Sequence, residues 1–114
     1  SGKWLENIRN AVHILDEMQP GFEYEGEMAP DAALNEKVMK LYPFSRLSGP
    51  ANVLIMPGLQ SANLSAKLLR ELGGDATVGP ILVGMEKPVQ IVPVTANVPD
   101  VLTLAVLAAA GIVE

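Results

Sequence analysis

The sequence predicts an α/β layered architecture with a mostly parallel sheet. Two observations favour this class. Helical periodicities alternate with short apolar runs along the chain, and the run VLIM at 53–56 is uninterrupted, as in strands that are buried on both faces. The 114 residues suit one compact domain or one piece of a larger one. Because the sequence begins directly in a helix and contains few strands, we expect residues 1–114 to form a single piece of a larger domain.

The first half of the sequence predicts two helices separated by a strand. Apolar residues recur three or four positions apart over 3–18, which indicates a helix with one buried stripe that Pro20-Gly21 ends. Aromatic residues then alternate with glutamates over 22–25, a pattern typical of a short strand. A second helix is expected over 30–42, where Pro43 stops it.

The second half continues the alternation of strands and helices. After the strand at 53–56, a helix is expected over 61–72, with Ser61 as its N-cap and Gly73-Gly74 as its stop. Two further apolar runs predict strands at 81–83 and 89–92.

The last predicted helix begins with a capping signal. Asn97 is the expected N-cap, and Asp100 stands three residues later, as in a capping box with Asp in place of Glu or Gln. The helix should run to Ala110, where Gly111 ends it. The apolar stretch 101–113 is too short to span a bilayer, which needs roughly 20 residues.

Composition excludes several classes of function. The formal net charge of −5 and the lack of a basic patch argue against a nucleic-acid partner. The sequence has no cysteine and a single histidine, which argues against thiolate chemistry and a zinc site. With no signal peptide and no membrane span expected, the sequence favours a cytoplasmic protein.

Several residues could carry chemistry, each with a plainer alternative. His13 could act as a general base, or could be a surface or packing residue of its helix. Glu23, Glu25 and Glu27 could act as paired carboxylates or bind a divalent ion, but they also suit a solvated strand face.

Two features near the C-terminus suggest a ligand site. Gly84 would let a ligand approach backbone amides, and Lys87 in the same turn would supply a cation for phosphate, although an ordinary turn explains both residues equally well. Asp100 could serve a ligand or only its own helix cap. The spacing matches neither a P-loop nor a dinucleotide fingerprint, so the residues alone predict no reaction.

Three stretches of the sequence carry recognisable motifs: 25-EGEMAPDAAL-34, 51-ANVLIMPGLQSANLSAKLLRELGG-74 and 78-VGPILVGMEKPVQI-91. In the same order and at similar spacing, they resemble signatures of the phosphate acetyl/butyryl transferase family. The resemblance implies the C-terminal portion of a two-lobed, three-layer α/β/α domain of the isocitrate/isopropylmalate dehydrogenase-like type. Its active site would lie in the cleft between the lobes.

Active members of this family transfer an acyl group between coenzyme A and phosphate. The resemblance implies a Ser-Arg pair after the KPV segment, and an Asp six residues beyond the Arg that takes the thiol proton of coenzyme A. Here Pro93-Val94 occupy the positions of the pair, while Asp100 is retained. Neither residue supplies a guanidinium or a hydroxyl, which implies a catalytically silent member in which Asp100 is vestigial. Ser45-Arg46 precede the strand at 53–56 and cannot substitute.

The motifs GEM…DAAL, ANVLIMP and KPVQIVPVTANV look closer to one branch, the C-terminal domain of bacterial-type NADP-dependent malic enzymes. This branch implies an oligomerisation and acetyl-CoA-sensing role, in a homo-oligomer of two or more chains. NADP and Mg or Mn would be bound by a part outside this sequence, which would itself hold no cofactor. The expected acyl-CoA residues are Gly84, Lys87, Asn97 and Asp100.

Two other functions remain open. The chain could belong to an active phosphate acetyl/butyryl transferase that uses other residues in place of Pro93-Val94. It could also be a purely structural dimerisation domain, for which the apolar final helix is the support.

Overall fold

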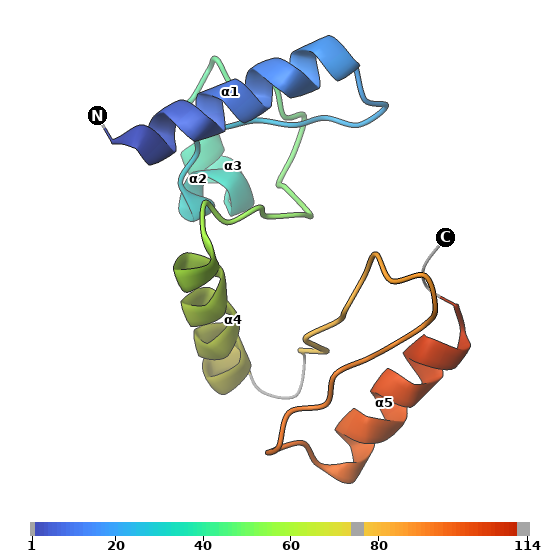
Figure 1. Cartoon of the computed structure of the whole chain (residues 1–114). Helices are drawn as coiled ribbons and strands as arrows, with labels where there is room; N and C mark the ends of the chain where they lie inside the picture. The colour runs from blue at the N-terminus through green and yellow to red at the C-terminus, as the bar shows by residue number, and fades with distance from the viewer. Residues whose placement is uncertain (1, 74–76, 112–114) are drawn as a thin grey trace. The chain divides into compact units, whose positions relative to one another are not determined.

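The computed structural model describes residues 2–73 and 77–111. Within these ranges it contains five helices (Figure 1): α1 (Lys3–Met18), α2 (Pro30–Leu34), α3 (Glu36–Met39), α4 (Leu59–Gly73) and α5 (Val98–Ala109). The chain divides into two compact units, Ser1–Asn63 and Leu64–Glu114, here called the N-terminal unit and the C-terminal unit.

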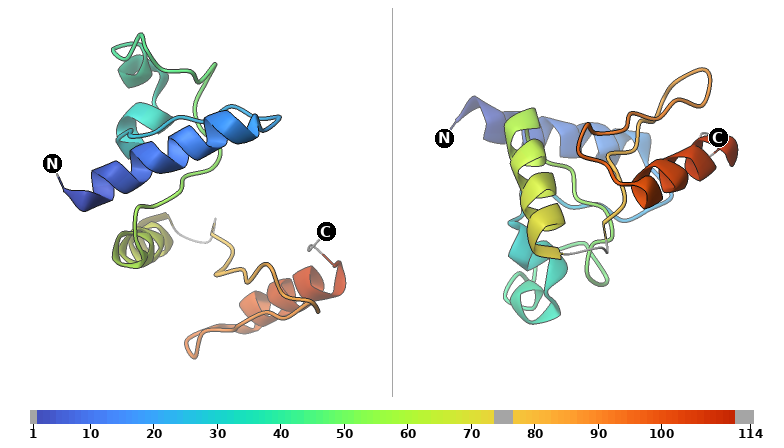
Figure 2. Two further views of the ribbon diagram at one scale, coloured as in Figure 1. Left: turned by 45° about the horizontal axis from the view of Figure 1, so that its top comes forward. Right: turned by 90° about the horizontal axis from the view of Figure 1, so that it is seen from below.

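The predicted sheet is wrong, and so is the α/β class with its three layers. Over 2–73 and 77–111 no residue lies in a strand, and the segments 22–25, 53–56, 81–83 and 89–92 are irregular. Figure 2 shows the two later segments as loops that precede α5. A strand needs ladder hydrogen bonds to a neighbouring strand, and in this part of the chain no backbone hydrogen bond joins two of these segments. Residues 53–55 of this apolar run are exposed, with Ile55 at 88%, and Met56 is half-buried.

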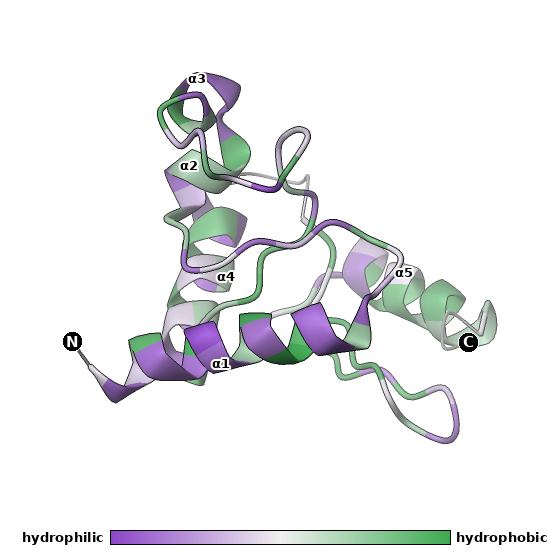
Figure 3. Ribbon diagram, turned by 90° about the horizontal axis from the view of Figure 1, so that it is seen from above, coloured by the Kyte–Doolittle hydropathy of each residue, from purple (hydrophilic) through white to green (hydrophobic). Residues whose placement is uncertain are grey.

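Helix α1 confirms the prediction for 3–18. Figure 3 shows hydrophilic and hydrophobic bands that alternate along it. The helix ends at Met18, two residues before Pro20 of the predicted Pro20-Gly21 stop. Gln19 turns into the left-handed region with a φ of 47°, and its N–H donates to the carbonyl of Leu15 at 3.0 Å.

The helix predicted over 30–42 is instead two short helices. Asn35 adopts extended angles, φ −117° and ψ 112°, and its side chain accepts a hydrogen bond from the N–H of Lys37 at 2.9 Å. This local bond caps α3 and competes with helix continuation. The buried residues Ala32 and Ala33 lie in α2, and the carbonyl of Ala33 accepts from the N–H of Ala51 at 2.8 Å.

Helix α4 begins at Leu59, two residues before the predicted N-cap. Ser61 is therefore inside the helix, where its hydroxyl donates to the carbonyl of Gly58 at 2.8 Å. An N-cap side chain would accept from an amide further along the chain, so this part of the prediction is wrong. Helix α4 reaches Gly73, and Gly74 of the predicted stop lies outside the described residues.

Helix α5 confirms the predicted capping box. The N–H of Asp100 donates to Oδ1 of Asn97 at 2.8 Å, and the N–H of Asn97 donates to Oδ2 of Asp100 at 3.1 Å. Beyond its C-cap, Gly111 has a φ of 61°, which glycine adopts readily.

The sequence of α5 is largely apolar, as Figure 3 shows, and Leu104 is its one buried residue. Residues 112 and 113 of the predicted apolar stretch lie outside the described part. None of the described helices is long and apolar enough to cross a membrane.

Candidate functional site

The C-terminal unit contains an open recess of about 730 Å³. Its walls come from the last turns of α4, from residues 77–79 and 93–97, and from the first two turns of α5. Of the residues that the sequence singled out, Pro93, Asn97 and Asp100 line it. The capping box places the last two together, because it folds their side chains over the same helix end.

An ion pair joins the two helices at this recess. Nη2 of Arg70 lies 3.4 Å from Oδ2 of Asp100, and their side chains are 36% and 32% exposed. The same carboxylate oxygen accepts the N–H of Asn97. Asp100 is thus bound both by its own helix cap and by a cation from α4. Among the described residues that line the recess, Arg70 is the only arginine or lysine.

The remaining polar groups of the recess suit binding better than catalysis. Three threonines, Thr77, Thr95 and Thr103, offer hydroxyl groups, and Glu71 adds a second carboxylate. The single histidine of the sequence, His13, belongs to the N-terminal unit. A hydroxyl is a weak nucleophile unless a base activates it, and of the two carboxylates in the lining Asp100 already accepts from Asn97 and Arg70. The recess can therefore hold a partly anionic ligand through Arg70 and hydroxyl groups.

Gly84 and Lys87 are not among the residues that line this recess. Both are exposed in a loop that the side chain of Gln90 closes. Its Oε1 accepts the N–H of Leu82 at 2.9 Å, and its Nε2 donates to the carbonyl of Leu82 at 3.2 Å. Gly84 has a φ of 80° and open space beside its Cα. Their assignment to a ligand stays a prediction.

Pro93 and Val94 form a turn at the edge of the recess. The carbonyl of Pro93 accepts the N–H of Ala96 at 3.0 Å. Val94 is fully exposed and does not line the recess. No cation or hydroxyl enters the recess from these two positions. Arg70 supplies the guanidinium instead, and the sequence prediction missed it. One signal was available, because Arg70 is the only arginine in residues 64–114.

In the N-terminal unit, Arg46 is the centre of a charged cluster. Its Nη1 lies 2.6 Å from Oδ1 of Asp16, and its guanidinium carbon lies 4.8 Å from the ring centroid of Tyr24. The hydroxyl of Tyr24 also donates to Oδ1 of Asp16 at 2.7 Å. The backbone N–H of Arg46 donates to Oε2 of Glu25 at 2.9 Å. These contacts fasten the loop around Arg46 to the end of α1 and to 24–25.

These hydrogen bonds shift the pKa values of the cluster. The pKa of Asp16 is lowered by the hydrogen bond from Tyr24 and then by that from Arg46. The hydrogen bond from Tyr24 to Asp16 raises the pKa of Tyr24, and the hydrogen bond from Arg46 to Asp16 raises the pKa of Arg46. The pKa of Glu23 is lowered because it accepts from the N–H of Ser48 and then from its hydroxyl. These shifts favour the charged forms of Asp16, Glu23 and Arg46, and the neutral form of Tyr24.

The glutamates that were predicted to act together as carboxylates instead each contact a different partner. Glu23 accepts two hydrogen bonds from Ser48, at 2.8 and 2.9 Å, and Glu27 pairs with Arg9 at 2.6 Å. Over the described ranges, no three His, Asp or Glu side chains are grouped so that they could hold a metal ion. His13 is exposed on α1 and lies 3.9 Å from Glu17, one turn away.

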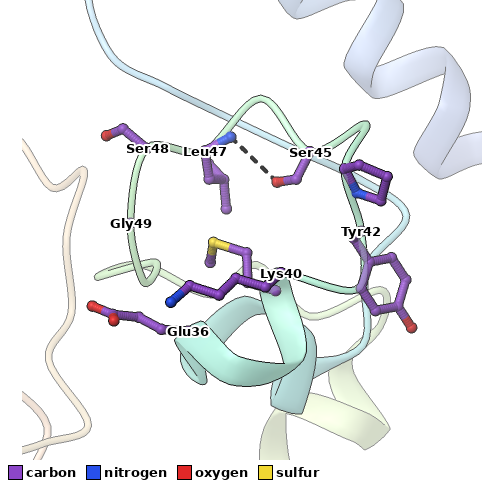
Figure 4. Close-up of a pocket in the computed structure, with 9 residues that line it drawn as sticks. Glu36, Lys40, Tyr42, Ser45, Leu47, Ser48 and Gly49 are labelled. Carbon is purple, nitrogen blue, oxygen red and sulfur yellow. Dashed lines mark hydrogen bonds between the residues drawn. The ribbon is translucent and has the colours of Figure 1, made fainter.

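A second recess, of about 400 Å³, lies in the N-terminal unit between α3 and residues 42–49. Figure 4 shows the chain curving around it, with Glu36 and Lys40 along one side. The hydroxyl of Ser45 already accepts the N–H of Leu47 at 3.3 Å, and that of Ser48 donates to Glu23. The hydroxyls of both serines are thus already engaged within the N-terminal unit. The recess of the C-terminal unit, with its ion pair, is the candidate site.

The comparisons with known proteins match nearly the whole chain. The family model for Phosphate acetyl/butaryl transferase matches residues 1–109. The chain is 54% identical over 109 residues to the NADP-dependent malic enzyme of Rhizobium meliloti (strain 1021), covering 96% of the chain and 14% of that protein. It is 38% identical over 103 residues to the NADP-dependent malic enzyme of Escherichia coli (strain K12), covering 89% of the chain and 14% of that protein.

A phosphate acetyltransferase is also similar. The protein of that name from Bacillus subtilis (strain 168) is 38% identical over 106 residues, covering 92% of the chain and 33% of the relative. The chain therefore spans about 14% of the length of the malic enzymes that it matches and about a third of this acetyltransferase.

Proposed function

Because this chain belongs to the phosphate acetyl/butaryl transferase family, we propose that it is a silent, acetyl-CoA-binding member of it. In this proposal it regulates and helps to assemble an NADP-dependent malic enzyme, a cytoplasmic homo-oligomer that converts malate to pyruvate and CO₂. The similarity to two malic enzymes over about nine-tenths of the chain supports the choice of parent.

One observation carries the loss of transferase activity: the recess offers binding groups without a free catalytic pair. Asp100 is engaged by the amide of Asn97 and by Arg70. Positions 93 and 94 provide neither a hydroxyl nor a guanidinium. Removing one positioned donor from an active site typically costs about a hundred- to a thousandfold in rate, so the absence of both should leave negligible transfer.

The malic enzyme chemistry is proposed to reside elsewhere in the parent protein. The sequence contains no dinucleotide fingerprint, so we place the sites for malate, NADP and Mg or Mn outside this chain. Acetyl-CoA is formed downstream of pyruvate, and a recess that binds it can therefore report how much product has accumulated. For regulation, acetyl-CoA must bind two states of the assembly with different affinities.

Paired assays on the full-length protein test this proposal. The first follows malate-dependent NADP reduction with and without acetyl-CoA, with coenzyme A as the matched control ligand. The second follows acetyl phosphate formation from acetyl-CoA and phosphate. We expect malate oxidation that changes with acetyl-CoA, and no acetyl phosphate. Malate oxidation that is indifferent to acetyl-CoA would contradict the sensing role.

An active phosphate acetyltransferase is the second candidate, favoured by the 38% identity to the enzyme of Bacillus subtilis. It predicts acetyl phosphate in the second assay and no malate oxidation. That result would mean that residues other than Pro93 and Val94 supply the missing groups.

A further inference from the structure

We propose that Arg70 holds the phosphate of a phosphate-bearing ligand in the recess of the C-terminal unit, and that it does so by exchanging Asp100 for the ligand. This inference deepens the proposed function, on which it rests, by naming the residue that binds acetyl-CoA. It concerns a side chain that the sequence motifs did not select.

The contact between Arg70 and Asp100 is loose enough to be exchanged. Its length of 3.4 Å exceeds the roughly 2.7–2.9 Å of a strong charge-assisted hydrogen bond. A guanidinium has several N–H donors arranged in a fork that matches phosphate. Only one of the Arg70 nitrogens contacts a partner within the described residues, and the side chain is 36% exposed. With respect to the described residues, Arg70 therefore has donors left for a ligand.

Asp100 can lose Arg70 without becoming an unpaired charge. Its Oδ2 also accepts the N–H of Asn97 at 3.1 Å, within the capping box of α5. A carboxylate at the third position of a helix is further stabilised by the helix macrodipole. Because leaving a polar group without a partner is the main cost of breaking such a contact, the exchange costs little on the Asp100 side.

The other groups of the recess are less suited than Arg70 to hold a phosphate. The N-terminus of α5 lacks free amides at its second and third positions, since Pro99 has no N–H and that of Asp100 is bound to Asn97. Glu71 and Asp100 repel an anion elsewhere in the recess. A phosphate would therefore be held at Arg70, with threonine hydroxyls as additional donors.

Calorimetric titration of the full-length protein with acetyl-CoA tests the inference. Arg70→Gln should weaken binding about tenfold or more, as expected for loss of a charge-assisted contact. Arg70→Lys should lose less affinity for acetyl-CoA, because lysine keeps the positive charge but not the forked arrangement of N–H donors. Lys67→Gln is the matched control, since it removes one positive charge from the same helix outside the recess, and should change affinity less than about twofold. Asp100→Asn keeps the cap acceptor and frees Arg70, so binding should be equal or tighter.

Three further titrants identify the chemistry that is recognised: acetyl phosphate, inorganic phosphate, and a phosphate-free acetyl thioester of N-acetylcysteamine. Arg70→Gln should weaken the phosphate-bearing compounds and leave the phosphate-free thioester unchanged. Equal weakening of the phosphate-free thioester would overturn the inference, because it would indicate a general structural effect. Loss of binding in Asp100→Asn, equal to that in Arg70→Gln, would overturn the exchange of partners.

The outcomes separate this inference from the proposed function. If Arg70→Gln binds acetyl-CoA as the unchanged protein does, the inference is wrong and acetyl-CoA sensing stands. If the unchanged protein binds acetyl phosphate through Arg70 but no acetyl-CoA, the inference stands and acetyl-CoA sensing fails. If no phosphate-bearing compound binds, both are wrong.

Discussion

The two units differ in how they use their charged groups. In the N-terminal unit, short contacts join segments that are far apart in sequence, such as Arg46 to Asp16 at 2.6 Å and Ser48 to Glu23 at 2.8 Å. In the C-terminal unit the one ion pair between described helices, Arg70 with Asp100, is longer at 3.4 Å. The first unit uses its charges to fasten loops. The second retains a cation that can exchange its partner.

This difference explains why the candidate site lies where it does. A side chain that closes a loop through several bonds cannot leave those bonds without releasing the loop. Arg46 contacts Asp16 and Tyr24 with its side chain, and Glu25 with its backbone N–H. Arg70 has no comparable set of contacts among the described residues. A strong charged cluster is thus a poor indicator of a ligand site here, and a weaker pair beside a recess is a better one.

The largest expected effect would come from the apolar anchor of the C-terminal unit. Leu104, 3% exposed, is the buried residue of α5. Leu104→Ala should cost about 2–5 kcal/mol in the free energy of local opening, toward the lower value because its surroundings can relax. Hydrogen exchange of the α5 amides measures it. Leu102→Ala, at a position 60% exposed, is the matched control and should change exchange little. Equal effects would show that α5 lacks this anchor.

An intermediate effect is expected at the start of the same helix. Asn97→Ala removes the acceptor for the N–H of Asp100 and should destabilise the first turn of α5 by about 1 kcal/mol. Faster hydrogen exchange of the amides of Asp100 and Val101 would report it. Asn97→Ser keeps a capping oxygen and should retain most of the protection. If both variants exchange alike, the capping box does not hold this end of the recess.

The smallest effect is expected in the N-terminal unit, where exposed contacts contribute little individually. The folded-state pKa values of Glu23 and Asp16 are lowered, so their stabilisation is complete above the ordinary values of 4.5 and 3.8 and is lost as pH falls through the folded values. Protection of the Ser48 amide, corrected for intrinsic exchange, should fall over this acid range. Glu23→Gln should remove much of this dependence. Protection that stays constant with pH would show that Glu23 does not fasten the loop.

Local sequence signals predicted helices α1 and α5 well. The periodicity of 3–18 and the pair Asn97 and Asp100 depend on residues within one or two turns, so the sequence contains the whole interaction. The helix over 30–42 was wrong because Asn35 binds the amide of Lys37 locally, a competition that apolar periodicity does not reveal. The apolar runs failed as strands because a strand depends on a partner far along the chain.

The same distinction applies to the site. Asn97 and Asp100 were found because they are three residues apart, and both line the recess. Arg70 was missed because its partner Asp100 lies thirty residues further along the chain, and the stretch 51–74 that contains Arg70 does not mark it as a ligand residue. Gly84 and Lys87 were chosen as a cation beside a glycine turn, but the Gln90 side chain closes that turn as a separate loop.

In the segment 23–25 alternate side chains have partners in different segments, as in a strand, although no neighbouring strand pairs with its backbone. Glu23 and Glu25 are bound by backbone amides of the loop 46–48, with the intervening Tyr24 bonded to Asp16. Each of three consecutive side chains therefore has its own partner. A single-residue insertion or deletion within this segment would shift the side chains on one side of the change away from their partners. In related sequences, length variation should accordingly fall outside 23–25, in the turn after α1 or before α2, where the chain can absorb it.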